Sequence, residues 1–447
     1  SLTNNVLLEP AQPKLKLKRI LIISPNFPPI SSPDSARIRA SLRYYRELGW
    51  EAKVLGFEAD ETAQAVDPTL AQLTDEVASV VRVKAWPLAA TRWTGLRNQG
   101  WRGWWRLRET GNRLISEFKP DLILFSTTVF NAFFHGVYWR KRWKIPFVLD
   151  LQDPWFNEHY KNNPLEKPPG GYKYYFASAV ARFGERHVYP HASGFISVSA
   201  GYFADLKRRF PTLSVPQLVL PFVPDEGDWH WVKHHRNSLA TPGLETSRIN
   251  IVAAGRGGRD MAPALNALLH HLSHATEIRA ECSIHLIGTA YTNRERPKPQ
   301  FNEEVSNWPD LDIRETPWRL PYLESLCWMM DASVNLILGS TDHRYSPSKF
   351  FNTFRAGRPV LVVAKSGTEL HSLAINHPNC FVLEMREDGT TDPSVLNSLV
   401  SFLGSANDSP KTEFSIPAAQ SALAATQRQA EFFKAVLADY TKTNGNT

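Results

Sequence analysis

The chain repeats one succession of elements: a short apolar strand, a loop of small and polar residues, and a helix. The first copy has its apolar run at residues 19–24 and its helix at 36–48. The second has a run at 249–254, a Gly-Arg-Gly-Gly-Arg-Asp loop at 255–260 and a helix at 263–272. A continuous apolar run is typical of a parallel strand that is covered on both faces. The repeat therefore predicts two doubly wound α/β units in tandem.

The length agrees with this division, because 447 residues exceed one ordinary core. An apolar content of 43% and a charged content of 21% are those of a globular protein and exclude a disordered chain. We expect a Rossmann-like N-terminal domain over residues 1–220 and a second Rossmann-like domain over 221–417. Residues 221–242 are interpreted as the interdomain linker. The last segment, 418–447, is predicted to be a helix that packs back on the first domain.

The net charge of +7 is unevenly distributed. Residues 1–220 hold 30 Lys and Arg against 19 Asp and Glu, whereas the remainder holds 21 against 25. A basic half can meet nucleic acid, anionic lipid or anionic ligands, or can simply be a solvated surface.

The cysteines and the N-terminal segment bear on the cellular compartment. Cys282, Cys327 and Cys380 form no CxxC pair, so neither a zinc site nor a disulfide framework is indicated. Three lone thiols fit a reducing cytoplasm. We expect no signal peptide, because the apolar run 20–23 soon meets Pro25.

The glycine-rich loop of the second unit is a candidate phosphate site. Its small residues, beginning with Gly255, let a phosphate approach the backbone, and the following helix offers N–H groups and a positive dipole. Arg256 and Arg259 add bidentate donors for phosphate oxygens. The alternative is an ordinary tight turn.

A second cluster further along the chain has the same character. Ser346 and Ser348 suit the start of a helix, and Lys349 would lie beside any anion held there. Asn352, three residues on, faces the same side as Lys349. An ordinary capped helix that ends near Gly357 is the alternative. Together with the arginine loop, the cluster favours a diphosphate-ribose site.

Residues 347–360, Pro-Ser-Lys-Phe-Phe-Asn-Thr-Phe-Arg-Ala-Gly-Arg-Pro-Val, resemble the nucleotide-ribose helix of group 1 glycosyltransferases. These are the retaining enzymes of glycosyltransferase family 4, which have the GT-B fold. The resemblance extends over nearly the whole chain. Its further motifs are residues 19–37, 150–155, 195–199, 254–256 and 286–288.

The resemblance implies two Rossmann-like domains that face each other across a cleft, with the nucleotide sugar on the second. It also implies transfer with retention, in which the departing diphosphate itself receives the proton of the acceptor. The protein would then position the reactants and stabilise charge. Arg256, Arg259 and Lys349 would neutralise the leaving group.

The chain departs from the family pattern at two places. Two family glutamates would fall at Arg344 and Asn352. An asparagine can still bond ribose hydroxyls, whereas Arg344 would contact phosphate, so recognition of the donor sugar must differ. In the first unit the family's paired glycines are replaced by Ser31-Ser32 or Ser35-Ala36, and Arg37 matches the family's arginine. A degenerate, inactive copy is one alternative.

Three further positions complete the predicted site. Asp153 follows the carboxyl end of a strand and is our candidate to hold or polarise the acceptor hydroxyl; the alternative is a helix cap beside Pro154. Trp318 or Arg319 is expected to pack on the base, unless the segment is a surface turn. We predict no metal, because the one Asp-x-Asp pair, at 310–312, falls at the start of a predicted strand.

Residues 82–144 are basic and rich in tryptophan. They hold 13 Lys and Arg against 3 Asp and Glu, and 7 of the 14 tryptophans. This composition is typical of a membrane-surface element, so we expect contact with anionic lipid and access for a lipid-linked acceptor. A core edge with a solvated basic face is the alternative. RNA binding uses similar residues, but we find no RNA-recognition motif and expect no nucleic-acid partner.

The sequence thus predicts a transferase that moves a sugar from a nucleotide sugar, in first place a UDP-sugar, to a saccharide or lipid-linked saccharide. Polysaccharide or glycolipid synthesis is the expected context. The expected location is the cytoplasm, with the inner face of the plasma membrane as a site of peripheral attachment. The donor is a co-substrate, and no cofactor is expected. Two alternatives stay open: a sugar-nucleotide epimerase of the GT-B fold, and a non-catalytic nucleotide-sugar-binding subunit. A dehydrogenase is disfavoured because the first loop lacks G-x-G-x-x-G.

Overall fold

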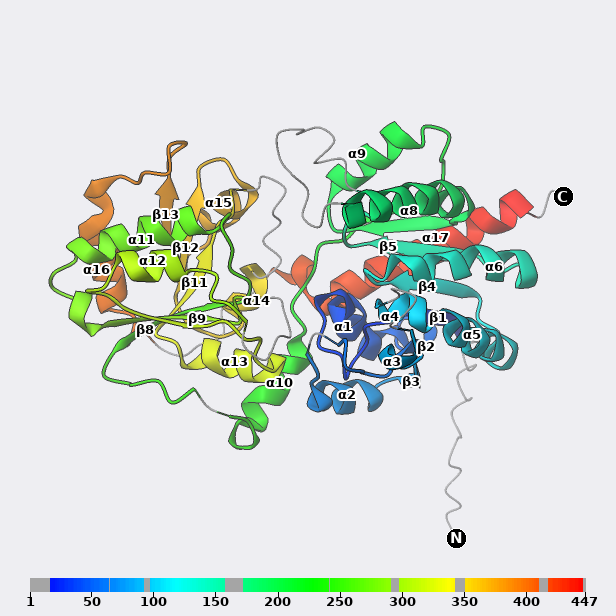
Figure 1. Ribbon diagram of the computed structural model, residues 1–447, viewed down its shortest axis with the longest axis horizontal. Coiled ribbons are helices and arrows are strands. Elements are labelled where there is room, and N and C mark those ends of the chain that lie inside the picture. The colour runs from blue at the N-terminus through cyan, green and yellow to red at the C-terminus, as the bar shows by residue number, and fades with distance from the viewer. Residues whose placement is uncertain are drawn as a thin grey trace, which may run out of the picture.

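The computed structural model describes residues 17–63, 65–91, 97–156, 172–240, 242–290, 297–341, 350–409 and 417–444. Two α/β units lie side by side, the first on the right and the second on the left of Figure 1. Each has one parallel sheet with helices on both faces.

The first sheet has the strand order β3-β2-β1-β4-β5-β6-β7. Its strands are β1 (Lys18–Ile23), β2 (Trp50–Phe57), β3 (Ser79–Val83), β4 (Leu122–Ser126), β5 (Phe147–Leu151), β6 (Gly194–Ser197) and β7 (Gln217–Val219). The second sheet has the order β10-β9-β8-β11-β12-β13. Its strands are β8 (Ile249–Ala254), β9 (Cys282–Ile287), β10 (Asp312–Thr316), β11 (Val334–Leu338), β12 (Val360–Lys365) and β13 (Cys380–Met385).

The α-helices follow the strands in alternation. In the first unit they are α1 (Ala36–Tyr45), α2 (Pro68–Asp75), α3 (Leu88–Thr91), α4 (Gln99–Arg102), α5 (Trp104–Phe118), α6 (Phe134–Trp143), α8 (Tyr172–Val188) and α9 (Ala200–Arg209). In the second they are α11 (Ala262–His274), α12 (Asn302–Asn307), α13 (Tyr322–Asp331), α14 (Phe350–Phe354), α15 (Glu369–Ala374) and α16 (Leu396–Gly404). Helix α10 (Glu226–His234) lies between the units, and α17 (Ala422–Asn444) follows them.

The first strand of each unit is central in its sheet. Strand β1 pairs with both β2 and β4, and β8 pairs with both β9 and β11. Residues 20–23 are fully buried, as two covered faces require. In both sheets the strand order reverses beside this central strand, and open α/β sheets bind their ligands at that switch point. The predicted GT-B arrangement of two Rossmann-like domains is confirmed.

The C-terminal helix α17 packs on the first unit, as predicted (Figure 1). Its Phe433 and Val436 are fully buried in the core that α1 forms on one face of the first sheet. The Tyr45 hydroxyl donates to Gln429 Oε1 at 2.8 Å, and Gln429 Nε2 donates to Ser41 Oγ at 2.7 Å. The end of the chain is therefore part of the first domain.

The predicted linker differs from the structure, because residues 226–234 within it form helix α10. Asp225 caps this helix by accepting from Gly227 N at 3.0 Å, and acidic residues occupy its first turn. Trp229 and Val232 pack with Leu70 of α2 and with Leu326 of α13 in one buried cluster. The segment therefore joins the two units through a shared apolar contact.

Candidate active site in the interdomain cleft

A cavity of about 310 Å³ lies between the two units. The first unit contributes the loop and helix start at residues 31–36, together with Arg39 and Leu70. The second contributes the carboxyl ends of β8, β9 and β11 and part of α13 and α14. Both loops of the repeated sequence signal therefore meet at one cleft, each at the carboxyl edge of its sheet.

The glycine loop of the second unit is tied to the neighbouring strand. Gly255 N donates to Ile287 O at 2.8 Å and Gly257 N to Thr289 O at 2.9 Å. Gly255 has a φ of 123°, which only glycine adopts readily. A Cβ on Gly257 would lie 2.4 Å from the Phe301 ring. The loop therefore needs its glycines for its own tight course, and this course leaves Gly255 and Arg256 in the wall of the cleft.

Arg256 is held by a carboxylate of its own loop. Its Nη1 and Nη2 donate to the two oxygens of Asp260 at 3.0 and 2.9 Å. Burial alone would raise the pKa of Asp260, but the hydrogen bonds from Arg256 and Ser340 outweigh it and lower that pKa below its usual value. Asp260 therefore stays ionised and fixes the planar guanidinium beside the cleft.

Asn352, on α14, lies in the cleft wall but has a protein partner. Its Oδ1 accepts from Trp229 Nε1 on α10 at 2.7 Å. Tyr322 lies in the same wall, and burial raises the pKa of its hydroxyl. The amide that was predicted to contact ribose is thus bonded to Trp229 and, through a second side-chain hydrogen bond, to Tyr322.

The remaining donor-side predictions are distributed as follows. Arg319 lines the cleft. Arg259 and Trp318 are exposed, and neither is among the described residues that line it. Arg344, Ser346, Ser348 and Lys349 lie outside the described residues. Among the described residues, the structure therefore brings together four predicted donor-side residues: Gly255, Arg256, Arg319 and Asn352.

On the first unit, a buried network fixes the strand ends that follow β4 and β5. Asp150 Oδ2 accepts from Arg37 Nε and from Ser126 Oγ, both at 2.8 Å. Gln152 Nε2 donates to Asp34 O at 2.8 Å. Because Pro33 and Ser35 line the cleft, this network sets the position of the first-unit wall.

Asp153 lies next to this network, at the end of β5. Burial of its carboxyl raises its pKa above the usual value, and the negative charge of Asp34 raises it further. Asp153 is not among the described residues that line the cleft. Its neighbour Asp34 lies in the chain between Pro33 and Ser35, which both line it. The geometry thus places Asp153 at the margin of the first-unit wall.

Sequence reasoning missed two residues of this site. Asp34 Oδ2 accepts from Thr128 N at 3.0 Å and from the Thr127 hydroxyl at 3.1 Å. The sequence did hold a signal for Asp34, because an aspartate in a loop at the carboxyl end of a strand is a candidate site residue. The sequence held no such signal for Trp229, the partner of Asn352. A tryptophan in a predicted linker does not indicate where its indole N–H points.

Comparison with known proteins agrees with this geometry. Residues 35–221 match the glycosyl transferase 4-like domain. Sucrose-phosphate synthase from Thermosynechococcus elongatus has a similar structure, with a TM-score of 0.52 and 12% identity over 96% of this chain and 98% of that one. For the UDP-forming α,α-trehalose-phosphate synthase from Burkholderia xenovorans the TM-score is 0.51, with 10% identity over 96% and 99%. A putative UDP-N-acetylglucosamine 2-epimerase from Listeria monocytogenes has a TM-score of 0.48, with 10% identity over 96% and 97%.

Identities this low show a shared fold and nothing more. No curated protein sequence matches the chain. Two Rossmann-like domains across a cleft define the GT-B fold. The match of residues 35–221 to the glycosyl transferase 4-like domain confirms the resemblance to group 1 glycosyltransferases.

Proposed function

We propose that the protein transfers a sugar from a nucleotide sugar, in first place a UDP-sugar, to a saccharide or lipid-linked saccharide with retention of configuration. The observation that carries the proposal is the cleft in which Arg256, fixed by Asp260, faces the small-residue wall at 31–36. A guanidinium oriented in this way can donate to a diphosphate through the N–H groups that do not bond Asp260. Small side chains opposite leave room for the sugar and the acceptor.

In this proposal the protein's contribution is positioning and charge stabilisation. The bond from the anomeric carbon to the diphosphate breaks, and the acceptor hydroxyl attacks from the same face. The departing diphosphate oxygen takes the hydroxyl proton. Arg256 stabilises the growing negative charge with a donor that is already oriented, and Lys349 is proposed to share this role. Asp153 would hold the acceptor hydroxyl at the first-unit wall.

We further propose that residues 82–144 contact an anionic membrane surface. Trp105 and Trp86 are exposed to 67% and 49%, which supports an interfacial role. Trp139 is instead fully buried in the core, as the alternative interpretation of this region expects. No helix in the described part of the chain has the length and apolarity that a membrane crossing requires.

Nucleotide binding tests the donor site. UDP at about 100 times its Kd is expected to stabilise the protein by about 2.7 kcal/mol and to raise the Tm in a thermal-shift assay. GDP and ADP report base preference in parallel. Arg256→Ala should remove the shift, whereas Arg314→Ala, on the exposed edge strand β10, should keep it. If UDP, GDP, ADP and their sugars all leave the Tm unchanged, the donor site is not in this cleft.

The pH dependence of transfer tests the acceptor side. Asp34→Asn is expected to move the acid limb of the kcat/KM profile to lower pH. Part of the rise in the Asp153 pKa comes from the Asp34 charge. Removing that charge lowers the pKa of Asp153, so its carboxylate persists to lower pH. An acid limb that stays in place in Asp34→Asn would show that Asp153 is not the titrating group.

A further inference from the structure

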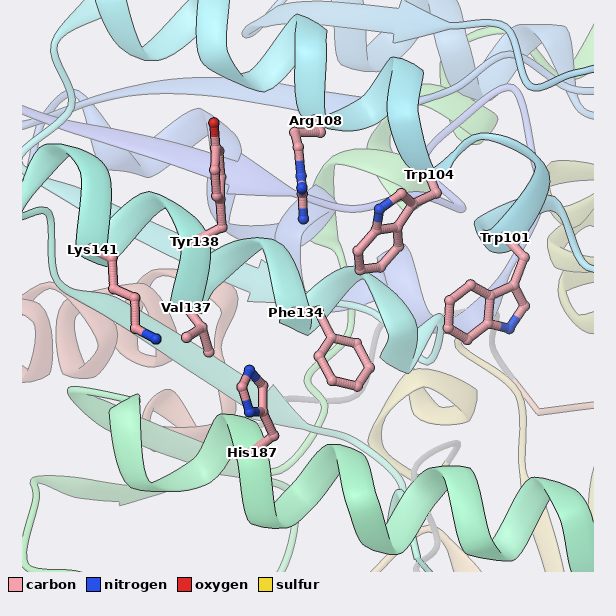
Figure 2. Close-up of a pocket in the computed structure, with 8 residues that line it drawn as sticks. All are labelled: Trp101, Trp104, Arg108, Phe134, Val137, Tyr138, Lys141 and His187. Atoms are coloured by element: carbon pink, nitrogen blue, oxygen red, sulfur yellow. The ribbon is translucent and has the colours of Figure 1, made fainter.

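A second cavity, of about 420 Å³, lies on the first domain among α4, α5, α6 and α8. We call it the aromatic–basic pocket. Its wall includes the aromatic side chains of Trp101, Trp104, Phe134 and Tyr138 and the basic side chains of Arg108 and Lys141. Figure 2 shows Arg108 pointing from its helix between Tyr138 and Trp104, and Lys141 pointing toward the helix that carries His187. The pocket thus combines apolar rings with two cations.

The aromatic rings form a continuous wall. Trp101 stacks on Trp104 with centroids 5.6 Å apart, and Trp104 meets the edge of Phe134 at 5.9 Å. Phe134 in turn contacts Phe183 of α8 at 6.3 Å. Helix α8, which lies outside the tryptophan-rich region of the sequence, therefore extends the same surface.

One face of α8 presents apolar side chains to solvent. Phe176 and Phe183 are exposed to 74% and 64%, and they lie seven residues apart, hence on the same face of the helix. His187 follows on that face and stacks on Phe183 at 5.9 Å. Exposed aromatic rings that adjoin a pocket in this way mark an interaction surface.

Among the residues that the structure describes, the cations of the pocket have no acidic partner. The Arg108 guanidinium lies over the rings of Tyr138 and Trp104, at 4.4 and 5.3 Å from their centroids. Its Nε donates to His135 Nδ1 at 3.4 Å. Burial, with a further contribution from Arg108, lowers the pKa of His135 to about 3, so this histidine is neutral.

Two other enclosed arginines of the domain do have acidic partners. Arg37 pairs with Asp150, and Arg209 with Glu185. Within the described ranges no carboxylate lies within ion-pair distance of Arg108 or Lys141. The pocket therefore combines an apolar rim with two positive charges that no described carboxylate compensates, and the complementary ligand is an anion attached to an apolar body.

We propose that this face docks on an anionic lipid surface, with a headgroup phosphate in the aromatic–basic pocket between Arg108 and Lys141. Phe176 and Phe183 would enter the interface beside it. The inference rests on the membrane contact proposed above for residues 82–144, and it adds the headgroup site and helix α8. Because α5, α6 and α8 pack on one face of the sheet and α17 on the other, docking leaves α17 away from the lipid.

Flotation of the full-length protein with vesicles tests the proposal. Wild type is expected to float with vesicles of phosphatidylcholine and phosphatidylglycerol, and much less with phosphatidylcholine alone. Arg108→Ala/Lys141→Ala should lower the partition coefficient on anionic vesicles roughly 10- to 30-fold, since each basic residue near such a surface contributes about one factor of five. Phe176→Ser/Phe183→Ser should weaken binding to both kinds of vesicle. Thermal unfolding would verify that each variant is folded.

The control removes equal charge from the opposite face. Arg428→Ala/Lys434→Ala, two exposed residues of α17, should float as wild type does. If wild type floats and the pocket and α8 variants float equally well, the headgroup site is wrong, although a membrane contact through residues 82–144 stands. If wild type floats with neither vesicle, both proposals are wrong. Free glycerol phosphate that competes as strongly as vesicles would also overturn the docking, because it would make the ligand a soluble phosphate.

Discussion

Arg256→Ala is expected to lower kcat for sugar transfer about 100- to 1000-fold, the usual loss when one pre-oriented donor to a developing negative charge is removed. Arg256 is the predicted phosphate ligand that the structure places in the cleft wall. Its bidentate contact with Asp260 fixes its orientation before any substrate arrives. Initial rates with a UDP-sugar donor and a saccharide acceptor would measure the loss.

Two further variants make this result specific. Arg256→Lys keeps the charge but loses the planar fork, so its kcat should lie between those of wild type and Arg256→Ala. Arg314→Ala, whose side chain is 55% exposed on β10, should match wild type. A kcat for Arg256→Ala that equals the wild-type value would show that Arg256 takes no part in the reaction.

Asp150→Asn is expected to cost about 3–5 kcal/mol of the free energy of unfolding. The side chains of Asp150 and Arg37 are exposed to only 0% and 3%, and the pair is 2.8 Å apart. Removing the carboxylate charge leaves the guanidinium buried and uncompensated. Urea unfolding, followed by far-UV circular dichroism, would measure the change.

A matched variant separates the effect of burial on stability from the effect of charge pairing alone. Glu387 pairs with Lys365 at 2.7 Å but is 89% exposed, so Glu387→Gln should cost less than about 1 kcal/mol. Equal losses of unfolding free energy in Asp150→Asn and Glu387→Gln would contradict the role given to the buried network at the strand ends.

The architecture could be predicted because each signal was local. A continuous apolar run, a loop and a helix identify a parallel α/β unit, and their repetition at residues 19–48 and 249–272 identifies two. Asp153 and the glycine loop were predicted as site residues because ligand sites lie at the carboxyl ends of strands, and the glycine loop lies in the cleft wall. The edge strand β3 was missed, since Ser79–Val83 is only partly buried and carries a charge within a weak apolar pattern.

The features of the site that could not be predicted depend on contacts between segments that are distant in the sequence. Nothing near Asn352 in the sequence indicates that Trp229 occupies its amide oxygen, because 123 residues separate the two. The same holds for α8, whose exposed phenylalanines extend the tryptophan-rich surface only after folding. Helix α10 was hidden by the proline and tryptophan content around it, although Asp225 and the acidic first turn were available as capping signals.

The most direct test of sugar transfer across this cleft is a product assay with a panel of nucleotide sugars and saccharide acceptors. The account predicts release of the nucleoside diphosphate that depends on the acceptor, together with a glycoside whose anomeric configuration, read by NMR, equals that of the donor. Interconversion of the nucleotide sugar without an acceptor would instead identify an epimerase. Tight nucleotide binding without any turnover would identify a non-catalytic subunit, and either result would contradict the proposed transfer.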